Sequence, residues 1–335
     1  MTIRVAINGF GRIGRLTFRA IIEKNSEDIE VVAVNDLASL DSVIHLLKYD
    51  SLHGKFTEEI QKDEDFFWVN NKKVSFFSEK NPEKLPWKEL NIDIVIESTG
   101  RFTNKADAKL HLNAGSKKVL ISAPSSDPDI TVVYGVNHKD IKNTDQIISN
   151  GSCTTNCLAP IAYLLEKNLG IISGYMTTVH SVTGDQKTID TFHSDFRRAR
   201  NASLSMIPTS TGAAKAVGKV LPSLIGKLDG SAIRVPTANV SLIDFCFVSE
   251  KETYSDEINT IIKNSTMNIF KGIVEAVDEH LVSCDFNHNP HSSIVDLSET
   301  KVINNNFCRV LSWYDNEWGF SNRLIDVVLS IFSSR

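Results

Sequence analysis

The chain has 335 residues, which is long enough for about two domains of ordinary size. Apolar residues make up 41% and charged residues 23%, a globular composition that excludes a disordered, collagen-like or coiled-coil chain. The net charge of −5 gives no bulk attraction to nucleic acid or to an anionic membrane surface. No apolar run is long enough to span a bilayer, so we expect neither nucleic acid nor a membrane as a partner.

Cysteine usage and the first residues bear on the compartment. The chain has 5 cysteines, an odd and sparse set that does not suit a disulfide framework. The stretch MTIRVAINGFGRIGR lacks the basic-then-apolar layout of a secretory signal and is typical of a first strand. We therefore expect a cytoplasmic protein.

Short β-branched runs alternate with helical stretches through residues 1–150. This alternation predicts an α/β unit with a doubly wound parallel sheet, that is, a Rossmann domain. The expected strands are residues 3–8, 30–35, 92–97, 118–121, 130–134 and 146–149, and the expected helices are residues 12–24, 39–49 and 103–115. The third helix has Thr103 as its expected N-cap. Two further strands, residues 66–69 and 73–77, flank the turn pair Asn70-Asn71 and predict a hairpin.

The pattern changes over residues 151–315, where longer strands predict a second, α+β domain on a mainly antiparallel sheet. The expected strands are residues 172–180, 232–247, 273–277, 281–286, 293–296 and 307–314, and the expected helices are residues 154–169, 211–221 and 255–265. The closing stretch from residue 316 is also expected to be helical.

A glycine-rich turn follows the first expected strand. Gly9, Gly11 and Gly14 form the pattern G-x-G-x-x-G between a strand and a helix. Gly9 allows a tight turn, Gly11 lets backbone N–H groups approach a pyrophosphate, and Gly14 lets helix and strand pack closely. Because the start of the helix also offers free N–H groups to phosphates, the pattern predicts a dinucleotide site.

An acidic residue at the end of the second expected strand indicates which dinucleotide binds. Asp36 lies about 20 residues after the last glycine, the spacing of the acid that binds the adenosine ribose. A carboxylate accepts hydrogen bonds from both ribose hydroxyls and repels a 2′-phosphate. The sequence therefore predicts NAD rather than NADP as the cofactor.

The segment SNGSCTTNCLAP places Cys153 at the start of a helix, after a strand and a turn. A thiol at a helix start is expected to have a lowered pKa. A small buried core residue is the alternative for a free cysteine, but the flanking Ser, Thr and Asn favour a nucleophile. Cys157 lies one turn further on and is expected to be a packed thiol. No second Cys/His pair has zinc-ligand spacing, so no metal site is predicted.

His180 ends the expected strand over residues 172–180. At that end of the strand it can reach the helix start at Cys153, which makes it a candidate base for nucleophilic catalysis. His288 and His291 resemble half of a metal site, but no third ligand is evident, and we expect an exposed turn.

Seven segments, in order along the whole chain, resemble one enzyme family. They are INGFGRIGR, SCTTNCLAP, TVHSVTGDQKTID, RRARNAS, IPTSTGAAKAVGKVLP, RVPTANVSLIDF and SWYDNEWGFSNR. They are similar to the phosphorylating glyceraldehyde-3-phosphate dehydrogenases of the bacterial, glycolytic type. The resemblance implies oxidation of D-glyceraldehyde 3-phosphate with NAD⁺ and inorganic phosphate to 1,3-bisphosphoglycerate.

The resemblance also implies the roles of the two candidate catalytic residues. Cys153 attacks the aldehyde to give a thiohemiacetal, and His180 takes the hydroxyl proton as hydride passes to the nicotinamide. Inorganic phosphate then cleaves the resulting thioester to an acyl phosphate. The thioester conserves the energy of oxidation that a carboxylate product would release.

The resemblance further implies the binding residues. For NAD these are Gly9, Gly11, Arg12, Ile13, Gly14, Asp36, Lys80, Thr99, Ser122 and Asn316. Two anion sites are implied, one with Thr183 and Arg234 and the other with Ser152, Thr154, Arg198, Thr211 and Gly212. Arginine suits both sites because its guanidinium is a forked, permanently charged phosphate ligand. Four residues depart from the common pattern: Lys80 replaces a frequent Arg, Phe320 replaces a frequent Tyr, and Thr191-Phe192 replaces a Leu-Pro pair.

The resemblance implies a homotetramer, a loop over residues 178–203 near a neighbouring subunit's cofactor, and a last helix, residues 316–335, that returns to the first domain. Erythrose-4-phosphate dehydrogenase is the alternative function, because that family shares SCTTNC and a segment like DFNHNPHS. It usually breaks the stretch STGAAKA, which is intact here at residues 210–216. Aspartate-semialdehyde dehydrogenase, a looser alternative, does not match the seven segments.

Overall fold

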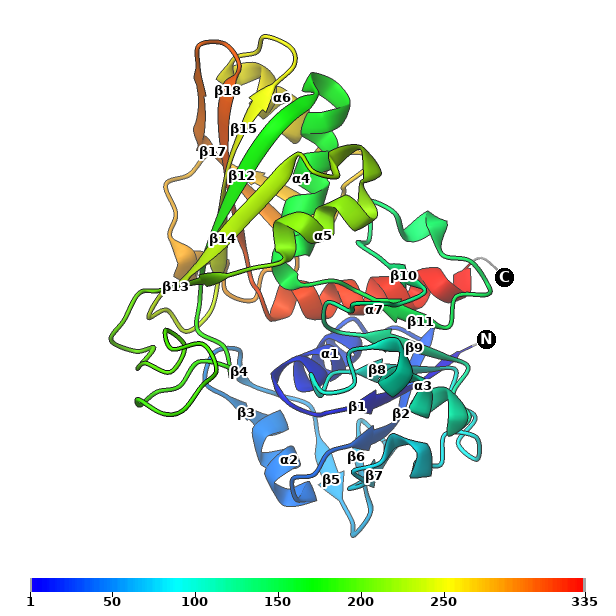
Figure 1. Cartoon of the computed structure of the whole chain (residues 1–335). Helices are drawn as coiled ribbons and strands as arrows, with labels where there is room; N and C mark the ends of the chain where they lie inside the picture. Colours follow the sequence, from blue (N-terminus) through cyan, green and yellow to red (C-terminus); the bar gives the residue numbers. More distant parts are fainter. Residues whose placement is uncertain (1, 334–335) are drawn as a thin grey trace. The chain divides into compact units, whose positions relative to one another are not determined.

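The computed structural model describes residues 2–333, and the chain divides into two compact units. Unit 1 comprises the residues up to 134, residues 138–151 and the residues from 321 onward. Unit 2 comprises residues 135–137 and 152–320. Each unit has its own large sheet (Figure 1). No helix among the described residues is both long and apolar enough to cross a membrane.

The sheet of unit 1 has the strand order β10-β11-β9-β8-β1-β2-β7-β6-β5. Every neighbouring pair from β10 to β7 is parallel, and only the β7-β6-β5 edge is antiparallel. The Rossmann prediction is therefore confirmed. The strands are β1 (Ile3–Asn8), β2 (Ile29–Asn35), β5 (Ile60–Lys62), β6 (Phe66–Val69), β7 (Lys72–Phe77), β8 (Ile94–Glu97), β9 (Lys118–Ile121), β10 (Ile130–Thr131) and β11 (Ile147–Ser149), with a separate pair β3 (Tyr49–Asp50) and β4 (Gly54–Lys55).

The central strands of unit 1 are buried on both faces, as parallel strands covered by helices should be. The neighbours Val5 and Ala6 on β1, like Ile94 and Val95 on β8, point to opposite faces of the sheet and have no exposed surface. The helices of this unit are α1 (Arg12–Glu23), α2 (Leu40–Lys48) and α3 (Lys105–Asn113), with short 3-10 turns η1 (Pro82–Lys84) and η2 (His138–Asp140). Because β1, β2 and β8 run parallel and in register, their carboxyl ends meet at one edge of the sheet.

The sheet of unit 2 has the order β13-β14-β12-β15-β18-β17-β16. It is mainly antiparallel, as predicted, with two parallel pairs, β12-β14 and β16-β17. The strands are β12 (Ile171–His180), β13 (Ile207–Ser210), β14 (Leu228–Arg234), β15 (Ser241–Ser249), β16 (Val274–Val277), β17 (Ser293–Ile303) and β18 (Phe307–Tyr314).

The helices of unit 2 cover its sheet. They are α4 (Cys153–Leu169), α5 (Ala213–Val220) and α6 (Ser255–Thr266), with 3-10 turns η3 (Pro222–Leu224) and η4 (Ser283–Phe286). Figure 1 shows α4 running along the sheet, where it contacts β12, β15, β17 and β18. The last helix, α7 (Trp318–Ser333), starts in unit 2 and belongs to unit 1 from Ser321 onward.

Two predicted strands of unit 2 were wrong. The expected single strand over residues 232–247 is two strands, because Pro236 lacks a backbone donor and Val240 has a φ of +65°, outside the strand region. Residues 281–286 hold a 3-10 turn instead of a strand. By contrast, β17 runs further than predicted, to Ile303.

In unit 1 the predicted hairpin is confirmed, since Asn70 and Asn71 adopt φ values of +49° and +65° between β6 and β7. The predicted N-cap of the third helix was wrong. Asn104, rather than Thr103, caps α3, and its side-chain oxygen accepts a hydrogen bond from the Asp107 N–H at 2.9 Å.

Candidate functional site

The glycine-rich turn joins β1 to α1 in unit 1, and its close approaches require glycine. Gly9 has a φ of +89°, and a Cβ on it would lie 2.6 Å from the Thr99 nitrogen. A Cβ on Gly14 would lie 2.2 Å from the Gly9 carbonyl oxygen. Gly11 caps α1 without a side-chain hydrogen bond, so the first N–H groups of this helix are open to an anion.

A cavity of about 300 Å³ lies over this turn. Its lining residues are Asn8, Gly9, Gly11, Asn35, Asp36, Leu37, Glu79, Lys80, Ser98, Thr99, Arg101 and Phe102. Asp36 accepts hydrogen bonds from the backbone N–H groups of Phe10, at 2.7 Å, and Ala38, at 2.9 Å. The structure thus brings Gly9, Gly11, Asp36, Lys80 and Thr99 together around one cavity.

Arg12, at the start of α1, is held by a forked ion pair with Asp50. Burial alone would raise the pKa of Asp50, but hydrogen bonds from Arg12 and from the N–H groups of His53 and Leu52 lower it to about 2. Ile13 is half-buried on α1, and Ser122 directly follows β9 with its N–H donated to the Glu97 carbonyl. These three residues lie on elements that border the glycine-rich turn or the sheet edge.

In unit 2 the candidate nucleophile and base are close together. Cys153 is the first residue of α4, and the Ser152 hydroxyl caps that helix by accepting from the Thr155 N–H at 3.0 Å. His180 is the last residue of β12 and is buried. Its Nε2 lies 3.6 Å from the Cys153 sulfur, so a proton can pass between the two side chains.

Arg234 ends β14 and is the register partner of His180 in the parallel pair β12-β14. Its Nη1 lies 2.6 Å from His180 Nδ1 and 2.9 Å from the Ser181 carbonyl oxygen. Burial, and then the charge of Arg234, lower the pKa of His180 to about 3, so the ring is neutral at pH 7. Nδ1 also lies 2.8 Å from the Ser181 carbonyl. It can accept from Arg234 or donate to Ser181, and the position of Arg234 therefore selects the tautomer.

The prediction that the helix start lowers the pKa of the Cys153 thiol is wrong, because burial outweighs the effects that lower it. Burial raises the pKa of Cys153, while the charge of Arg234 and hydrogen bonds from Thr154 lower it only in part. At neutral pH the pair is therefore a thiol beside a neutral imidazole. Proton transfer must accompany attack on a substrate.

Tyr314, at the end of β18, is a residue that the sequence analysis missed. Its hydroxyl lies 2.8 Å from Thr154 Oγ1 and 2.9 Å from Thr178 Oγ1, and its ring packs edge-on against His180. Burial raises the pKa of Tyr314 well above its usual value. The hydroxyl of Thr154, an expected anion ligand, is thus engaged inside the unit. A tyrosine closing a long apolar strand was the signal available in the sequence.

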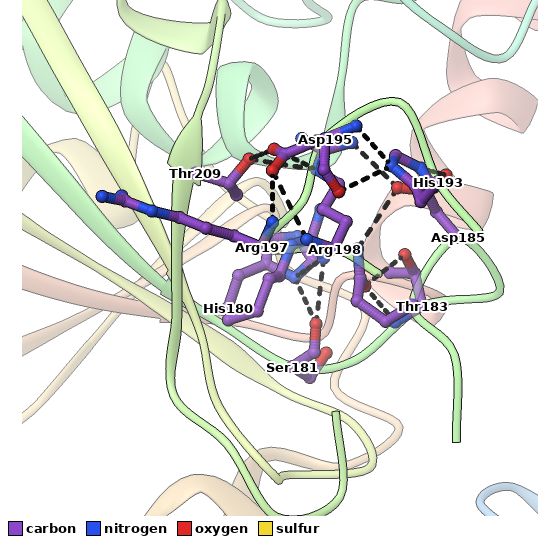
Figure 2. A network of polar contacts seen from close by, with 11 residues as sticks. His180, Ser181, Thr183, Asp185, His193, Asp195, Arg197, Arg198 and Thr209 are labelled. Carbon is purple, nitrogen blue, oxygen red and sulfur yellow. Dashed lines mark hydrogen bonds and ion pairs between the residues drawn. The ribbon is translucent and has the colours of Figure 1, made fainter. Parts of the chain in front are cut away.

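Figure 2 shows Arg198 held by a cluster of polar residues. Its Nη1 donates to Asp185 at 2.8 Å and its Nε donates to the Thr209 hydroxyl at 3.0 Å. Thr209 in turn donates to Asp195 at 3.1 Å. The sequence analysis missed Asp185 and Asp195, although both acids lie close to the RRAR run.

The remaining expected anion ligands of unit 2 lie at element ends. Thr183 donates its hydroxyl to Gln186 Oε1 at 3.0 Å. Thr211 Oγ1 accepts from the Ala213 N–H at 3.2 Å, and Gly212 caps α5 without a side-chain hydrogen bond. The start of α5 therefore presents backbone N–H groups.

Asn316, the expected cofactor ligand in unit 2, is buried and has a fixed orientation. Its Oδ1 accepts hydrogen bonds from the hydroxyls of Ser181 and Ser241, each at 2.8 Å. With its oxygen engaged twice, the amide nitrogen is the group left to face a ligand.

The other cysteine and histidine candidates have structural roles. Cys157 is fully buried against the hydroxyls of Ser293 and Ser312, and burial raises its pKa to about 12, as befits a packed thiol. His288 stacks on Trp318 with ring centroids 3.8 Å apart. Among the described residues no group of three or more His, Cys, Asp or Glu side chains could hold a metal ion.

Comparisons with known proteins agree with this geometry. Residues 3–105 match the family model described as glyceraldehyde 3-phosphate dehydrogenase, NAD binding domain, and residues 152–316 match its C-terminal domain. The chain is 54% identical over 331 residues to glyceraldehyde-3-phosphate dehydrogenase of Xanthobacter flavus, covering 99% of each chain. It is 53% identical to the protein of that name from Zymomonas mobilis and 50% identical to glyceraldehyde-3-phosphate dehydrogenase 1 of Bacillus cereus, covering 97% of each chain.

Proposed function

Because the chain belongs to the glyceraldehyde-3-phosphate dehydrogenase family, we propose that it oxidises D-glyceraldehyde 3-phosphate with NAD⁺ and inorganic phosphate to 1,3-bisphosphoglycerate. The observation that supports this most directly is the 3.6 Å approach of the Cys153 sulfur to His180 Nε2, with Arg234 beside the same ring. A nucleophile, a base and a permanent cation in one cluster suit a substrate that carries both an aldehyde and a phosphate.

The residues of unit 1 fit NAD. The glycine-rich turn leaves no room for a Cβ at Gly9 or Gly14, and the uncapped start of α1 suits a pyrophosphate. Asp36 is fixed by two backbone N–H groups and would accept from the ribose hydroxyls. Gly11, Arg12, Ile13, Lys80, Thr99, Ser122 and, in unit 2, Asn316 complete the proposed set. When bound, NAD⁺ supplies the hydride acceptor for the aldehyde oxidation.

The protein's own residues carry out the covalent steps. Cys153 attacks the aldehyde carbon, and its proton passes to His180 Nε2. His180 can accept at Nε2 only when Nδ1 donates to the Ser181 carbonyl, which lies 2.8 Å away. A bound anion that draws Arg234 off Nδ1 favours this tautomer. Substrate binding would therefore prepare the base for the proton that it must take.

Two anion sites are required, one for the phosphate of the aldehyde and one for the attacking inorganic phosphate. Arg234 with Thr183 is proposed for one site. The other comprises Arg198, Ser152, Thr154, Thr211 and Gly212, where the starts of α4 and α5 contribute backbone N–H groups. Arg198 is paired with Asp185, so an incoming phosphate exchanges one anionic partner for another.

We further propose a cytoplasmic homotetramer. The loop before β13 exposes large apolar side chains, among them Phe192, Phe196, Leu204 and Met206, and Phe192 is fully exposed. Such a patch is typical of a surface that another chain covers. All five cysteines are free, which suits a reducing compartment. In domain terms, we propose that residues 1–150 with the closing stretch from residue 316 form the cofactor domain and that residues 151–315 form the catalytic domain; residues 334–335 of that stretch lie outside the described residues.

The test is NADH formation from glyceraldehyde 3-phosphate with and without inorganic phosphate, with erythrose 4-phosphate in parallel. We expect turnover that requires phosphate and prefers the triose. Cys153→Ser should lose at least about 10³-fold of the turnover while NAD⁺ binding is retained, because an alcohol cannot replace the thiolate nucleophile. Phosphate-independent turnover or a preference for the tetrose would favour the erythrose-4-phosphate enzyme instead.

A further inference from the structure

A buried carboxylate in unit 1 has no part in the function proposed above. The side chains of Glu97, at the end of β8, and His111, on α3, are both 0% exposed. Burial of a carboxylate is costly unless several donors satisfy it. The identity and arrangement of those donors indicate what the residue does.

Backbone groups fix the donors around Glu97. Asn35 Nδ2 donates to the Glu79 carbonyl and its Oδ1 accepts from the Glu79 N–H, each at 2.9 Å, so the amide can have only one orientation. Asn35 Nδ2 also donates to Asn8 Oδ1 at 2.7 Å. Asn8 must therefore point its Nδ2 at Glu97, where it donates to Oε2 at 2.6 Å.

The protonation of His111 is fixed in the same way. The indole N–H of Trp87, which can only donate, lies 3.0 Å from His111 Nδ1. Nδ1 therefore carries no proton, and the ring is the neutral Nε2–H tautomer. Its Nε2 donates to Glu97 Oε2 at 3.0 Å. Asn8 Nδ2 and His111 Nε2 thus converge on a single carboxylate oxygen.

The other oxygen of Glu97 holds the wall of the cofactor cavity. Oε1 accepts from the Thr99 N–H at 2.8 Å and from the Thr99 hydroxyl. Thr99 and Ser98 lie directly against the glycine turn, since a Cβ on Gly9 would meet their backbone at 2.6 to 2.8 Å. Ser98 Oγ also donates to the Gly9 carbonyl at 2.6 Å. The position of Thr99 therefore sets the position of the turn.

We propose that Glu97 and His111 are positioning residues for the dinucleotide site: the carboxyl group of Glu97, held by His111 and Asn8 on one oxygen, fixes Thr99 and through it the phosphate-binding turn at Gly9. Neither residue lines the cavity itself. The inference rests on the proposed function, because it takes NAD⁺ to be the ligand of this cavity. It implies that this buried side chain contributes to cofactor affinity as well as to folding.

The test uses His111→Leu and His111→Gln in the full-length protein, with NAD⁺ and ADP-ribose binding measured by calorimetry. Leucine removes the donor to Glu97, and we expect the Kd of both ligands to rise about tenfold. Glutamine retains an N–H donor at a similar reach and should stay within about threefold of the wild type. In kinetics, KM for NAD⁺ should rise in His111→Leu while kcat and KM for the aldehyde stay unchanged.

Glu97→Gln is the companion variant, because it keeps the size of the side chain but turns one acceptor into a donor. Its NAD⁺ Kd should rise by at least about tenfold. Phe67→Leu, on β6 away from the cavity, is the control for lost stability; Phe67 is fully buried, and the variant should lower the Tm without changing the Kd. If Glu97→Gln does not fold, the His111 pair still decides the question.

The positioning role would be overturned if His111→Leu left the Kd values unchanged. It would also be overturned if His111→Gln and Phe67→Leu lost as much affinity as His111→Leu. Either result would leave the proposed function standing. A wild-type protein that binds neither NAD⁺ nor ADP-ribose would overturn both proposals.

Discussion

Each of the two units has a polar cluster at the ends of neighbouring parallel strands. The two clusters differ in how completely their polar atoms find hydrogen-bond partners. Around Glu97 in unit 1, the donors of Asn8, Trp87 and Thr99 each meet an acceptor, and the Glu79 backbone fixes the Asn35 amide that orients Asn8. Around His180 in unit 2, a guanidinium lies 2.6 Å from an imidazole, and the buried Nε of Arg234 has no hydrogen-bond partner among residues 2–333.

This difference separates a scaffold from a reactive site. A matched network is rigid and holds a binding surface in place. Burial, and then the charge of Arg234, lower the pKa of His180, and the cluster holds a cation without an anion beside it. We therefore expect the cluster in unit 2 to be completed by an anionic ligand, whereas the cluster in unit 1 is complete.

Among the changes that test this comparison of the two clusters, removal of the Arg234 cation should have the largest effect. In Arg234→Leu we expect kcat/KM for the aldehyde to fall about 100-fold, because a charge-assisted contact to the substrate phosphate is lost. Alkylation of Cys153 at pH 7 should also become slower, since the charge of Arg234 lowers the pKa of the thiol. Steady-state kinetics and iodoacetamide labelling measure the two effects.

Arg200→Leu is the matched control, because Arg200 is exposed and pairs with Asp190 at 2.9 Å. It should change neither quantity much. Full kcat/KM in Arg234→Leu, or faster alkylation, would contradict the role given to this cation.

The depressed pKa of His180 should make stability depend on pH. The ring titrates near 3 when folded and near 6.5 when unfolded, so the unfolded state binds the extra proton between these values. This contribution is fully present above pH 6.5 and is lost as the pH falls, by about 1.4 kcal/mol per pH unit.

Urea unfolding at pH 7 and pH 5 measures this dependence. Going from pH 7 to pH 5, the wild type should lose roughly 2 kcal/mol more than His180→Asn, whose side chain does not titrate. Equal pH dependence in the two proteins would show that His180 is not the neutral, buried group described above.

The smallest expected effect concerns the support of Arg198. Asp195→Asn removes the charge beside the guanidinium and weakens the hydrogen bond from Thr209, which lies 3.1 Å away. KM for inorganic phosphate should rise by about threefold to tenfold, with NAD⁺ binding unchanged. Asp190→Asn is the control, because Asp190 contacts Arg200 and the Asn201 N–H and has no hydrogen bond or ion pair with Arg198 in the part of the chain described, and an equal rise there would contradict a specific role for Asp195.

Much of the fold was predictable because periodicity is local. The strand over Ile3–Asn8, the hairpin at Asn70-Asn71 and the antiparallel character of unit 2 follow from side-chain patterns within a few residues. Strand ends were harder to predict: β14 and β15 are separated by a positive φ at Val240, which no apolar pattern reveals. Residues 281–286 look like a strand by composition, but tertiary packing makes part of them a 3-10 turn.

The candidate site was predictable where chemistry follows from local position, as with a thiol at a helix start and a histidine at a strand end. The pKa shifts of these groups could not be predicted from the sequence. The pKa of Cys153 rises because of burial, and burial depends on residues far away in the chain, such as Tyr314. Asp195 and Glu97 act through other side chains, so no motif marks them. For Glu97, the sequence held one hint, a charged residue ending an otherwise apolar strand.

The register of β12 and β14 has a consequence for how this chain can change over generations. His180 and Arg234 are partners in a parallel pair, and the chain between the two strands crosses over through the loop that carries Arg198. Insertions or deletions in that crossover leave this partnership intact, provided that they fall outside the segments that hold Thr183 and Arg198 in place. A single residue inserted within β14 would turn Arg234 to the opposite face of the sheet. Changes in chain length in this enzyme can therefore arise in the crossover, whereas β12 and β14 on either side of it tolerate no insertion.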